Sequence, residues 1–207
     1  MKNISIFSLF LAGLIFMSCS NTKLISSYAS PGAKIEKSNK ILVIAMMSDN
    51  DKKLRANIES MMVQTLRSQG IDAGSSVTLF GPNAFASMGE KAVVQKLKDK
   101  NFDKTVTIAL LDKTKENYYR PGYVGLTPYA YHFWGYYNYY YPMVYRPGYI
   151  TDKNKFILEG NVYSLDTDKL LYSAQTKTIN PDSPQQLAST FTKTLLSDMY
   201  KNGVFSN

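Results

Sequence analysis

Few side chains in this 207-residue sequence could do chemistry. Catalysis by a Cys–His or Ser–His pair needs an imidazole beside a nucleophile. The sequence contains one histidine, His132, which lies in a tyrosine-rich stretch, and one cysteine, Cys19, whose context is that of a lipid attachment site. We therefore interpret His132 as an amphipathic loop residue, and we expect the chain not to be an enzyme.

Two close pairs of carboxylates are the other candidates for acid–base or metal chemistry. Asp49 with Asp51 and Asp166 with Asp168 both lie in predicted turns, where aspartate is favoured because its side chain bonds local backbone amides. A transition-metal site needs several His, Cys or carboxylate ligands that converge, and the sequence offers no such set. There is also no glycine-rich phosphate loop. We expect no metal and no cofactor.

The N-terminus has the features of an export signal. Lys2 precedes an apolar run over residues 4–17, which is too short to span a bilayer and fits the hydrophobic region of a signal peptide. The run ends at Phe16-Met17-Ser18-Cys19, the pattern of a bacterial lipoprotein cleavage box. We predict a signal peptide over 1–18 and a diacylglyceryl group on Cys19. An ordinary signal peptide cut elsewhere and an uncleaved anchor are the alternatives.

Export also constrains the partners. The formal net charge of the chain is +8, and such a basic surface is attracted to an anionic membrane or envelope polymer. Nucleic acid is excluded as a partner by the predicted export. We expect a protein anchored by lipid to the bacterial outer membrane and facing the periplasm. Residues 19–39 are polar and rich in serine, so we interpret them as the lipidated cysteine with a flexible tether.

Hydrophobic periodicity predicts one α/β (α+β) domain over residues 40–207. Two strand–helix–strand units indicate right-handed crossovers and a partly parallel sheet, which a final hairpin extends in antiparallel pairing. We expect a mixed sheet of about five strands with three helices. The predicted strands are 41–47, 77–80, 105–111, 155–163 and 170–178, and the predicted helices follow Asn50, Ser87 and Ser183 and end near Gly70, Asn101 and Gly203.

A long insertion, residues 113–153, separates the third and fourth predicted strands. It holds 12 of the 16 tyrosines and is bracketed by two identical pentapeptides, 119–123 and 145–149, each with a Pro-Gly pair that favours a tight turn. Tyrosine offers a broad face and a hydroxyl at low entropic cost, and arginine can pair with carboxylates or phosphates. The candidate binding surface consists of Tyr119, Arg120, Tyr123, Tyr131, Trp134, Tyr137, Tyr140, Tyr145, Arg146 and Tyr149.

Three interpretations of this insertion stay open at the level of sequence. Its aromatic side chains could recognise a glycan, a protein partner or a membrane surface, since tyrosine and tryptophan also favour the headgroup level of bilayers. It could instead be a hairpin that packs on itself and covers a face of the sheet. It could also be a low-complexity flexible loop.

The first half of the domain carries a resemblance. The run Lys40-Ile41-Leu42-Val43-Ile44, the pair Arg55 and Glu59, and Leu66 before Gln69-Gly70-Ile71 resemble the opening unit of small bacterial envelope lipoproteins. The layout is similar to the α/β domain of curli-secretion-type lipoproteins and of peptidoglycan-synthase-activator lipoproteins. The resemblance implies an adaptor or assembly role, without the pore formation of the curli family. We expect Arg55 and Glu59 to form an exposed helical ion pair.

These observations lead to two hypotheses about function. The first is a non-enzymatic, membrane-anchored binding or adaptor module that presents the tyrosine-rich insertion to an envelope protein or to peptidoglycan. The second is an oligomeric structural or secretion-accessory lipoprotein in which the insertion packs between subunits. A third hypothesis, a hydrolase that uses carboxylates, is the least favoured.

Overall fold

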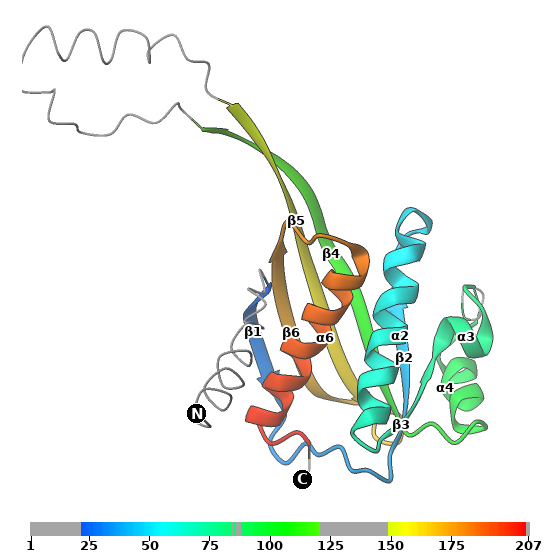
Figure 1. Ribbon diagram of the computed structural model, residues 1–207. Coiled ribbons are helices and arrows are strands. Elements are labelled where there is room, and N and C mark those ends of the chain that lie inside the picture. Colours follow the sequence, from blue (N-terminus) through cyan, green and yellow to red (C-terminus); the bar gives the residue numbers. More distant parts are fainter. Residues whose placement is uncertain (1–21, 84, 86–87, 121–148, 206–207) are drawn as a thin grey trace, which may run out of the picture.

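The computed structural model describes residues 22–83, 85, 88–120 and 149–205, with backbone only for residues 90, 116–120 and 149–152. Within these residues six strands form one mixed sheet in the order β1-β6-β5-β4-β2-β3, accompanied by four α-helices and a 3-10 turn (Figure 1). The predicted α/β class is confirmed. The predicted five strands and three helices fall short of the observed number by one each.

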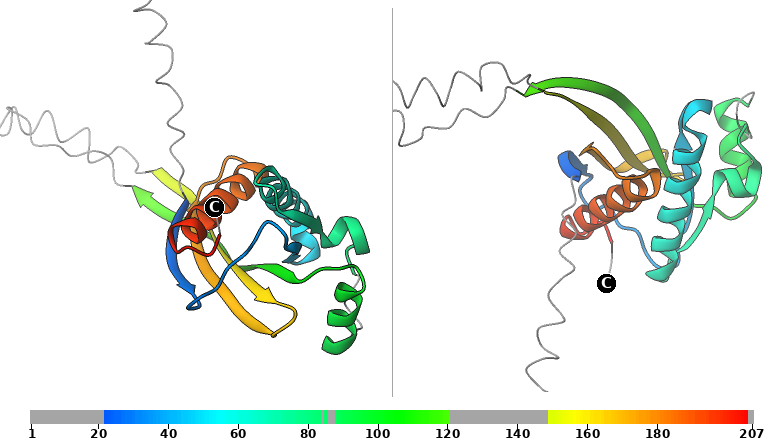
Figure 2. Two further views of the ribbon diagram at one scale, coloured as in Figure 1. Left: turned by 90° about the horizontal axis from the view of Figure 1, so that it is seen from below. Right: turned by 45° about the horizontal axis from the view of Figure 1, so that its top comes forward.

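The strands are β1 (Thr22–Ala29), β2 (Lys40–Met46), β3 (Asp72–Ser75), β4 (Lys104–Arg120), β5 (Tyr149–Ser164) and β6 (Lys169–Ile179). The helices are α2 (Lys52–Ser68), α3 (Ser76–Phe80), α4 (Glu90–Lys98) and α6 (Pro184–Lys201), and the 3-10 turn η1 is Asp49–Asp51. β2 pairs in parallel with β3 and β4, and all other pairs are antiparallel. The helices α2 and α6 lie side by side over one face of the sheet (Figures 1 and 2).

The strand β2 lies between β4 and the edge strand β3 and is buried on both faces. Ile41, Val43 and Ala45 face the main core beneath α2 and α6, whereas Leu42 belongs to a second cluster with Leu97 of α4. A strand that is covered on both faces has a continuous apolar sequence, because neither face is in contact with water. The predicted strand at 41–47 and the amphipathic helix after it are therefore confirmed.

The second predicted strand, 77–80, is wrong. These residues form the short helix α3, whose first turn is capped by the Ser75 hydroxyl as it accepts a hydrogen bond from the Thr78 N–H at 3.2 Å. The strand lies just before it, as β3. A Cβ on Gly74 in this strand would come within 2.6 Å of a Leu79 methyl and 3.2 Å of the Phe102 ring. The packing thus requires a residue of low strand propensity, which conceals the strand from a sequence pattern.

The predicted tether over 19–39 is also corrected, because residues 22–29 form the edge strand β1. The strand pairs with β6 from Thr22 opposite Thr178 to Ala29 opposite Tyr172, with a bulge near Leu24. Most of its side chains are exposed. An edge strand needs no alternation of apolar residues when so little of it is buried, and its polar composition therefore resembles that of a linker.

The predicted insertion at 113–153 is narrower than expected, because β4 and β5 continue far into it. The two strands pair with each other as far as Arg120 opposite Tyr149. Their other neighbours stop earlier: β6 pairs with β5 only as far as Ile179 opposite Lys155, and β2 pairs with β4 only as far as Met46 opposite Ala109. Residues 115–120 and 149–154 therefore form a two-stranded ribbon beyond the rest of the sheet, which we call the arm (Figure 1). At 3.3 Å per residue the arm is about 20 Å long.

The C-terminal part of the domain agrees with the prediction. β5 and β6 form the expected hairpin around Asp168, whose φ of 52° is a left-handed conformation that aspartate tolerates in turns. In α6, Ser183 accepts a hydrogen bond from the N–H of Gln186, and proline occupies the first turn, as the capping-box spacing predicted. Gly160 in β5 allows close contact with this helix, since a Cβ there would meet a Leu195 methyl at 2.9 Å.

Candidate functional site

The predicted binding residues fall into two groups in this structure. Tyr119, Arg120 and Tyr149 occupy the last two pairs at the tip of the arm, and their backbones are described. The predicted lipidation site, Cys19, lies outside the described residues. The other predicted binding residues also lie outside them: Tyr123, Tyr131, Trp134, Tyr137, Tyr140, Tyr145 and Arg146. The arm thus brings the two ends of the tyrosine-rich stretch together, one strand apart.

A pocket of about 410 Å³ lies at the root of the arm, between the N-terminal ends of α2 and α6. Its lining combines apolar side chains with charged ones. The apolar residues include Leu54, Phe156 and Leu187, and the charged residues are Asp51, Lys52, Lys53, Lys113 and Asp182. Helix N-termini and lysines favour negative charge, but the two aspartates offset two of the three lysines, so the lining carries only a small net positive charge. We refer to η1, the first turns of α2 and α6, and the root of the arm as the arm-end surface.

Two carboxylates at the arm-end surface are held in ion pairs. The Lys113 Nζ donates a hydrogen bond to Asp51 Oδ1 at 2.6 Å, which keeps the pKa of the Asp51 carboxyl below its usual range. Asp112 accepts hydrogen bonds from the Thr114 hydroxyl and the Lys155 ammonium, which likewise lower the pKa of its carboxyl. Both carboxylates are therefore ionised at neutral pH, and neither is suited to act as a general acid.

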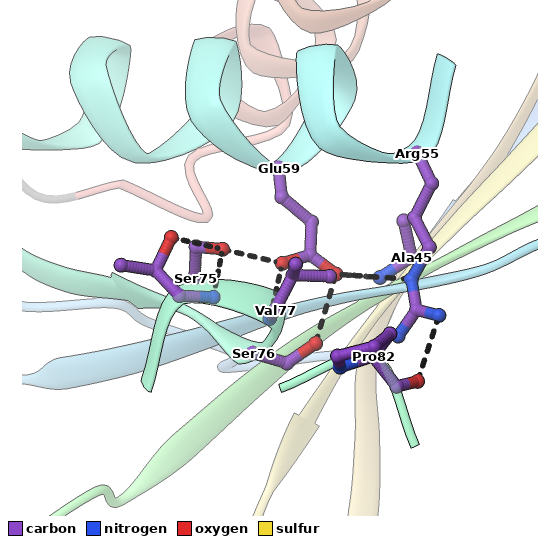
Figure 3. A network of polar contacts seen from close by, with 8 residues as sticks. Ala45, Arg55, Glu59, Ser75, Ser76, Val77 and Pro82 are labelled. Atoms are coloured by element: carbon purple, nitrogen blue, oxygen red, sulfur yellow. Dashed lines mark hydrogen bonds and ion pairs between the residues drawn. The ribbon is translucent and has the colours of Figure 1, made fainter. Parts of the chain in front are cut away.

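A third carboxylate, Glu59, is fully buried in α2 and differs from the sequence-based expectation. Glu59 Oε1 accepts hydrogen bonds from the Ala45 N–H at 2.9 Å and the Ser76 hydroxyl at 2.8 Å. Glu59 Oε2 accepts from the Ser75 hydroxyl at 2.6 Å and the Val77 N–H at 3.0 Å (Figure 3). The predicted helical pair of Arg55 and Glu59 is present, but its predicted exposure is wrong, because the carboxylate points inward and ties α2 to β2 and to the β3–α3 junction.

Arg55 compensates part of the buried charge from one turn away. Its Nε lies 3.8 Å from Glu59 Oε1, and its guanidinium donates a hydrogen bond to the Pro82 carbonyl at 2.9 Å (Figure 3). The sequence contains a signal for this burial, since Glu59 stands three and seven residues before Met62 and Leu66 on the apolar stripe of α2. With both oxygens already accepting two hydrogen bonds, Glu59 has a structural role.

The remaining candidates do not converge on a reaction centre. Asp166 pairs with Lys98 at 3.3 Å across a surface turn, and Asp49 lies exposed in η1. Among the described residues, no three His, Cys, Asp or Glu side chains are grouped closely enough to hold a metal ion. No helix in the described part of the chain has the length and apolarity needed to cross a bilayer.

Comparison with known proteins adds information on the fold alone. No protein-family model matches the chain, and no curated protein matches it. Among solved structures, a PelC dodecamer from Paraburkholderia phytofirmans is similar over 83% of this chain and 95% of that one, at 11% identity and a TM-score of 0.47. Lipoprotein GNA1162 from Neisseria meningitidis is similar over 79% of this chain and 99% of that one, at 10% identity and a TM-score of 0.44.

Both TM-scores lie below 0.5, so no property of either protein is transferred to this chain. The resemblance to curli-secretion-type and peptidoglycan-synthase-activator lipoproteins is not confirmed by these structures. A likeness in the arrangement of strands and helices also leaves function open, because one fold supports many functions.

Proposed function

We propose that this chain is a non-enzymatic lipoprotein of the bacterial outer membrane that faces the periplasm and presents its tyrosine-rich segment to an envelope protein or to peptidoglycan. The lipid is attached at Cys19 after removal of residues 1–18. The domain acts as a binding or adaptor module, and the arm carries the segment that makes the contact.

The arm is the observation that supports this proposal most directly. Beyond Lys155 and Ile179 the hairpin has no neighbouring strand among the described residues, so the arm contributes little to the core of the domain. An isolated two-stranded ribbon is only marginally stable in water. A ribbon of this kind that leads into a stretch of tyrosines is better explained by a contact with another molecule than by the stability of its own fold.

The test compares the intact protein with a variant in which residues 121–148 are replaced by Asn-Gly. Because Arg120 and Tyr149 form the last pair, a two-residue turn can close the hairpin without disturbing its register. We expect the variant to keep its melting temperature and to lose crosslinks to an envelope protein or retention on purified sacculi. Tyr28→Ser, which removes a half-exposed tyrosine from β1, is the control and should retain both.

If the Asn-Gly variant keeps every crosslink and the same retention, the tyrosine-rich segment is not the binding surface and the proposal fails. Mass spectrometry of the protein from its own host tests the anchor separately, since an unmodified Cys19 thiol contradicts the lipoprotein assignment.

The alternative, an oligomeric structural or secretion-accessory role, is favoured by one observation. The outer edge of β1 has no partner strand among the described residues, and its side chains Leu24 and Ile25 are 38% and 50% exposed. An open edge with apolar side chains can pair with another copy of the chain. Light scattering of the unlipidated domain tests this role: a mass that rises with concentration supports it, and a constant monomer mass contradicts it.

A further inference from the structure

The strand β1 begins at the same end of the sheet at which the arm leaves it. Thr22 pairs with Thr178 of β6, which pairs with Phe156 of β5, which pairs with Lys113 of β4. The Thr22 hydroxyl also bonds to Thr178 and Thr190, both at 2.8 Å, so the start of β1 is fixed to the sheet and to α6. The chain therefore enters the domain at the arm-end surface (Figure 1).

The proposed anchor is very close to this point. Only Ser20 and Asn21 separate Cys19 from the first residue of β1. Three residue steps span about 10 Å even when fully extended, so the Cα atom of Thr22 cannot lie much farther than this from the Cα atom of Cys19. A long tether would let the domain turn freely, whereas this one holds a defined end of the sheet next to the membrane.

The exposed side chains near this end suit a lipid surface. Lys52 and Lys53 are exposed at the start of α2, and Asp49 and Asp182 are exposed at the same end of the domain. The attraction of lysine to anionic headgroups acts over about the Debye length, ~10 Å at 0.1 M salt. Large apolar side chains are exposed within the last few residues before the end of the sheet, on three different strands. These are Leu24 and Ile25 of β1, Met46 of β2 and Leu111 of β4, each between 38% and 54% exposed.

We propose that the arm-end surface rests on the headgroup layer of the membrane that holds Cys19, with the lysines at the start of α2 close to anionic lipid phosphates. The proposal depends on the lipidation of Cys19 in the proposed function. It deepens that function, because it places the root of the arm at the level of the membrane. The opposite end, with the turn at Thr167, points away from the lipid.

The arm in this orientation runs along the membrane or into its headgroup layer. In Figure 1 it bends toward the side on which β1 lies instead of continuing straight from the sheet. Its length of about 20 Å exceeds the ~10 Å reach of the chain from Thr22 to Cys19, so a straight arm normal to the membrane would pass the depth of the anchor. The binding partner of the tyrosine-rich segment is therefore expected at the membrane surface.

The experiment measures the distance of two labelled positions from the lipid in the full mature protein. Asn50→Cys places a thiol in η1 at the arm-end surface, and Thr167→Cys places one in the turn between β5 and β6. Acylated Cys19 has no free thiol, so each variant takes a single fluorophore. The protein is reconstituted in vesicles of phosphatidylethanolamine and phosphatidylglycerol that contain a lipid with a nitroxide on its headgroup.

The two positions differ in depth because β5 extends roughly 25 Å from Phe156 to Ser164. We expect the label at position 50 to be quenched at least about threefold more than the label at position 167, because position 167 lies farther from the headgroups by about the length of this part of β5. Equal quenching, or stronger quenching at position 167, overturns the orientation. The mass of the purified protein reports acylation: acylated Cys19 with equal quenching refutes the orientation alone, whereas unmodified Cys19 refutes the proposed function.

A pair of charge variants tests the role of the lysines. Lys52→Gln with Lys53→Gln removes two charges from the arm-end surface, and Lys100→Gln with Lys169→Gln removes two exposed charges near the opposite end. We expect the first pair to reduce quenching at position 50 in vesicles with phosphatidylglycerol, and the second pair to leave it unchanged. An equal effect of both pairs, or no effect of the first, contradicts contact between these lysines and the lipid.

Discussion

The buried carboxylate of Glu59 gives the sharpest test of the described structure. Replacement by glutamine keeps the shape of the side chain but exchanges one acceptor oxygen for an NH₂ group. A serine hydroxyl can rotate and accept from this group, but the backbone N–H of Ala45 or Val77, whichever faces it, loses its acceptor. Two charge-assisted hydrogen bonds are thereby lost or reversed, and the buried part of Arg55 loses its counter-charge at 3.8 Å.

Each charge-assisted hydrogen bond contributes about 1.5–3 kcal/mol, and removing one member of a buried pair costs about 3–5 kcal/mol. We therefore expect Glu59→Gln to lower the free energy of unfolding by about 3–5 kcal/mol. In a domain of this size, 1 kcal/mol shifts the melting temperature by about 2–4 °C, so the expected fall is ~6–20 °C. Circular dichroism during thermal and urea unfolding measures both quantities.

Glu36→Gln is the matched control, because it makes the same chemical change at an exposed position. Surface changes of this kind usually stay within about 0.5 kcal/mol. If Glu59→Gln also changes the free energy of unfolding by less than about 1 kcal/mol, the Glu59 carboxylate does not accept the four hydrogen bonds from β2 and the β3–α3 junction, and it does not hold these elements to α2.

Three further predictions concern the packing and charge of the domain. Gly160→Ala should cost about 1–3 kcal/mol in urea unfolding, because its Cβ would collide with α6. Gly89→Ala, with open space around it, should cost about 1 kcal/mol or less, because it only replaces the N-cap of α4 with a poorer one. Ser183→Ala should cost about 1 kcal/mol in the same assay, through loss of the α6 cap. Asp51 and Asp112 have lowered pKa values in the folded state, so their stabilisation is present above the ordinary carboxyl pKa and is lost as the pH falls through the folded values. The double variant Asp51→Asn with Asp112→Asn should therefore show a smaller fall in melting temperature on acidification than the native chain, and an unchanged pH profile would contradict these ion pairs.

The sequence was informative where burial leaves a regular pattern. The continuous apolar run at 41–47, the four-residue steps of α6 and the Ser183-Pro184 start of that helix all predicted elements that the structure contains. In each case one dominant force, burial or capping, determines both the residue types and the local backbone.

The sequence failed where a long-range contact overrides local preference. Gly74 is required by the packing of Leu79 and Phe102, so β3 lacks the residues that identify a strand. Glu59 is a charged residue on the apolar stripe of α2. Its burial depends on hydrogen-bond donors from β2 and from the start of α3, and the periodicity of a helix contains no information about donors on other elements. The direction of the arm relative to β1 is likewise a property of strand order, and could not be predicted from spacing.

The edge strand β1 also bears on the order in which the chain folds. Its only strand partner among the described residues is β6, and the hydrogen-bonded hydroxyls of Thr22 and Thr178 are 156 positions apart. The first strand to emerge during synthesis therefore cannot take its place until nearly the whole chain has been made, and closing so long a loop delays its docking. Until then residues 22–29 lack the strand partner that holds them in the folded domain.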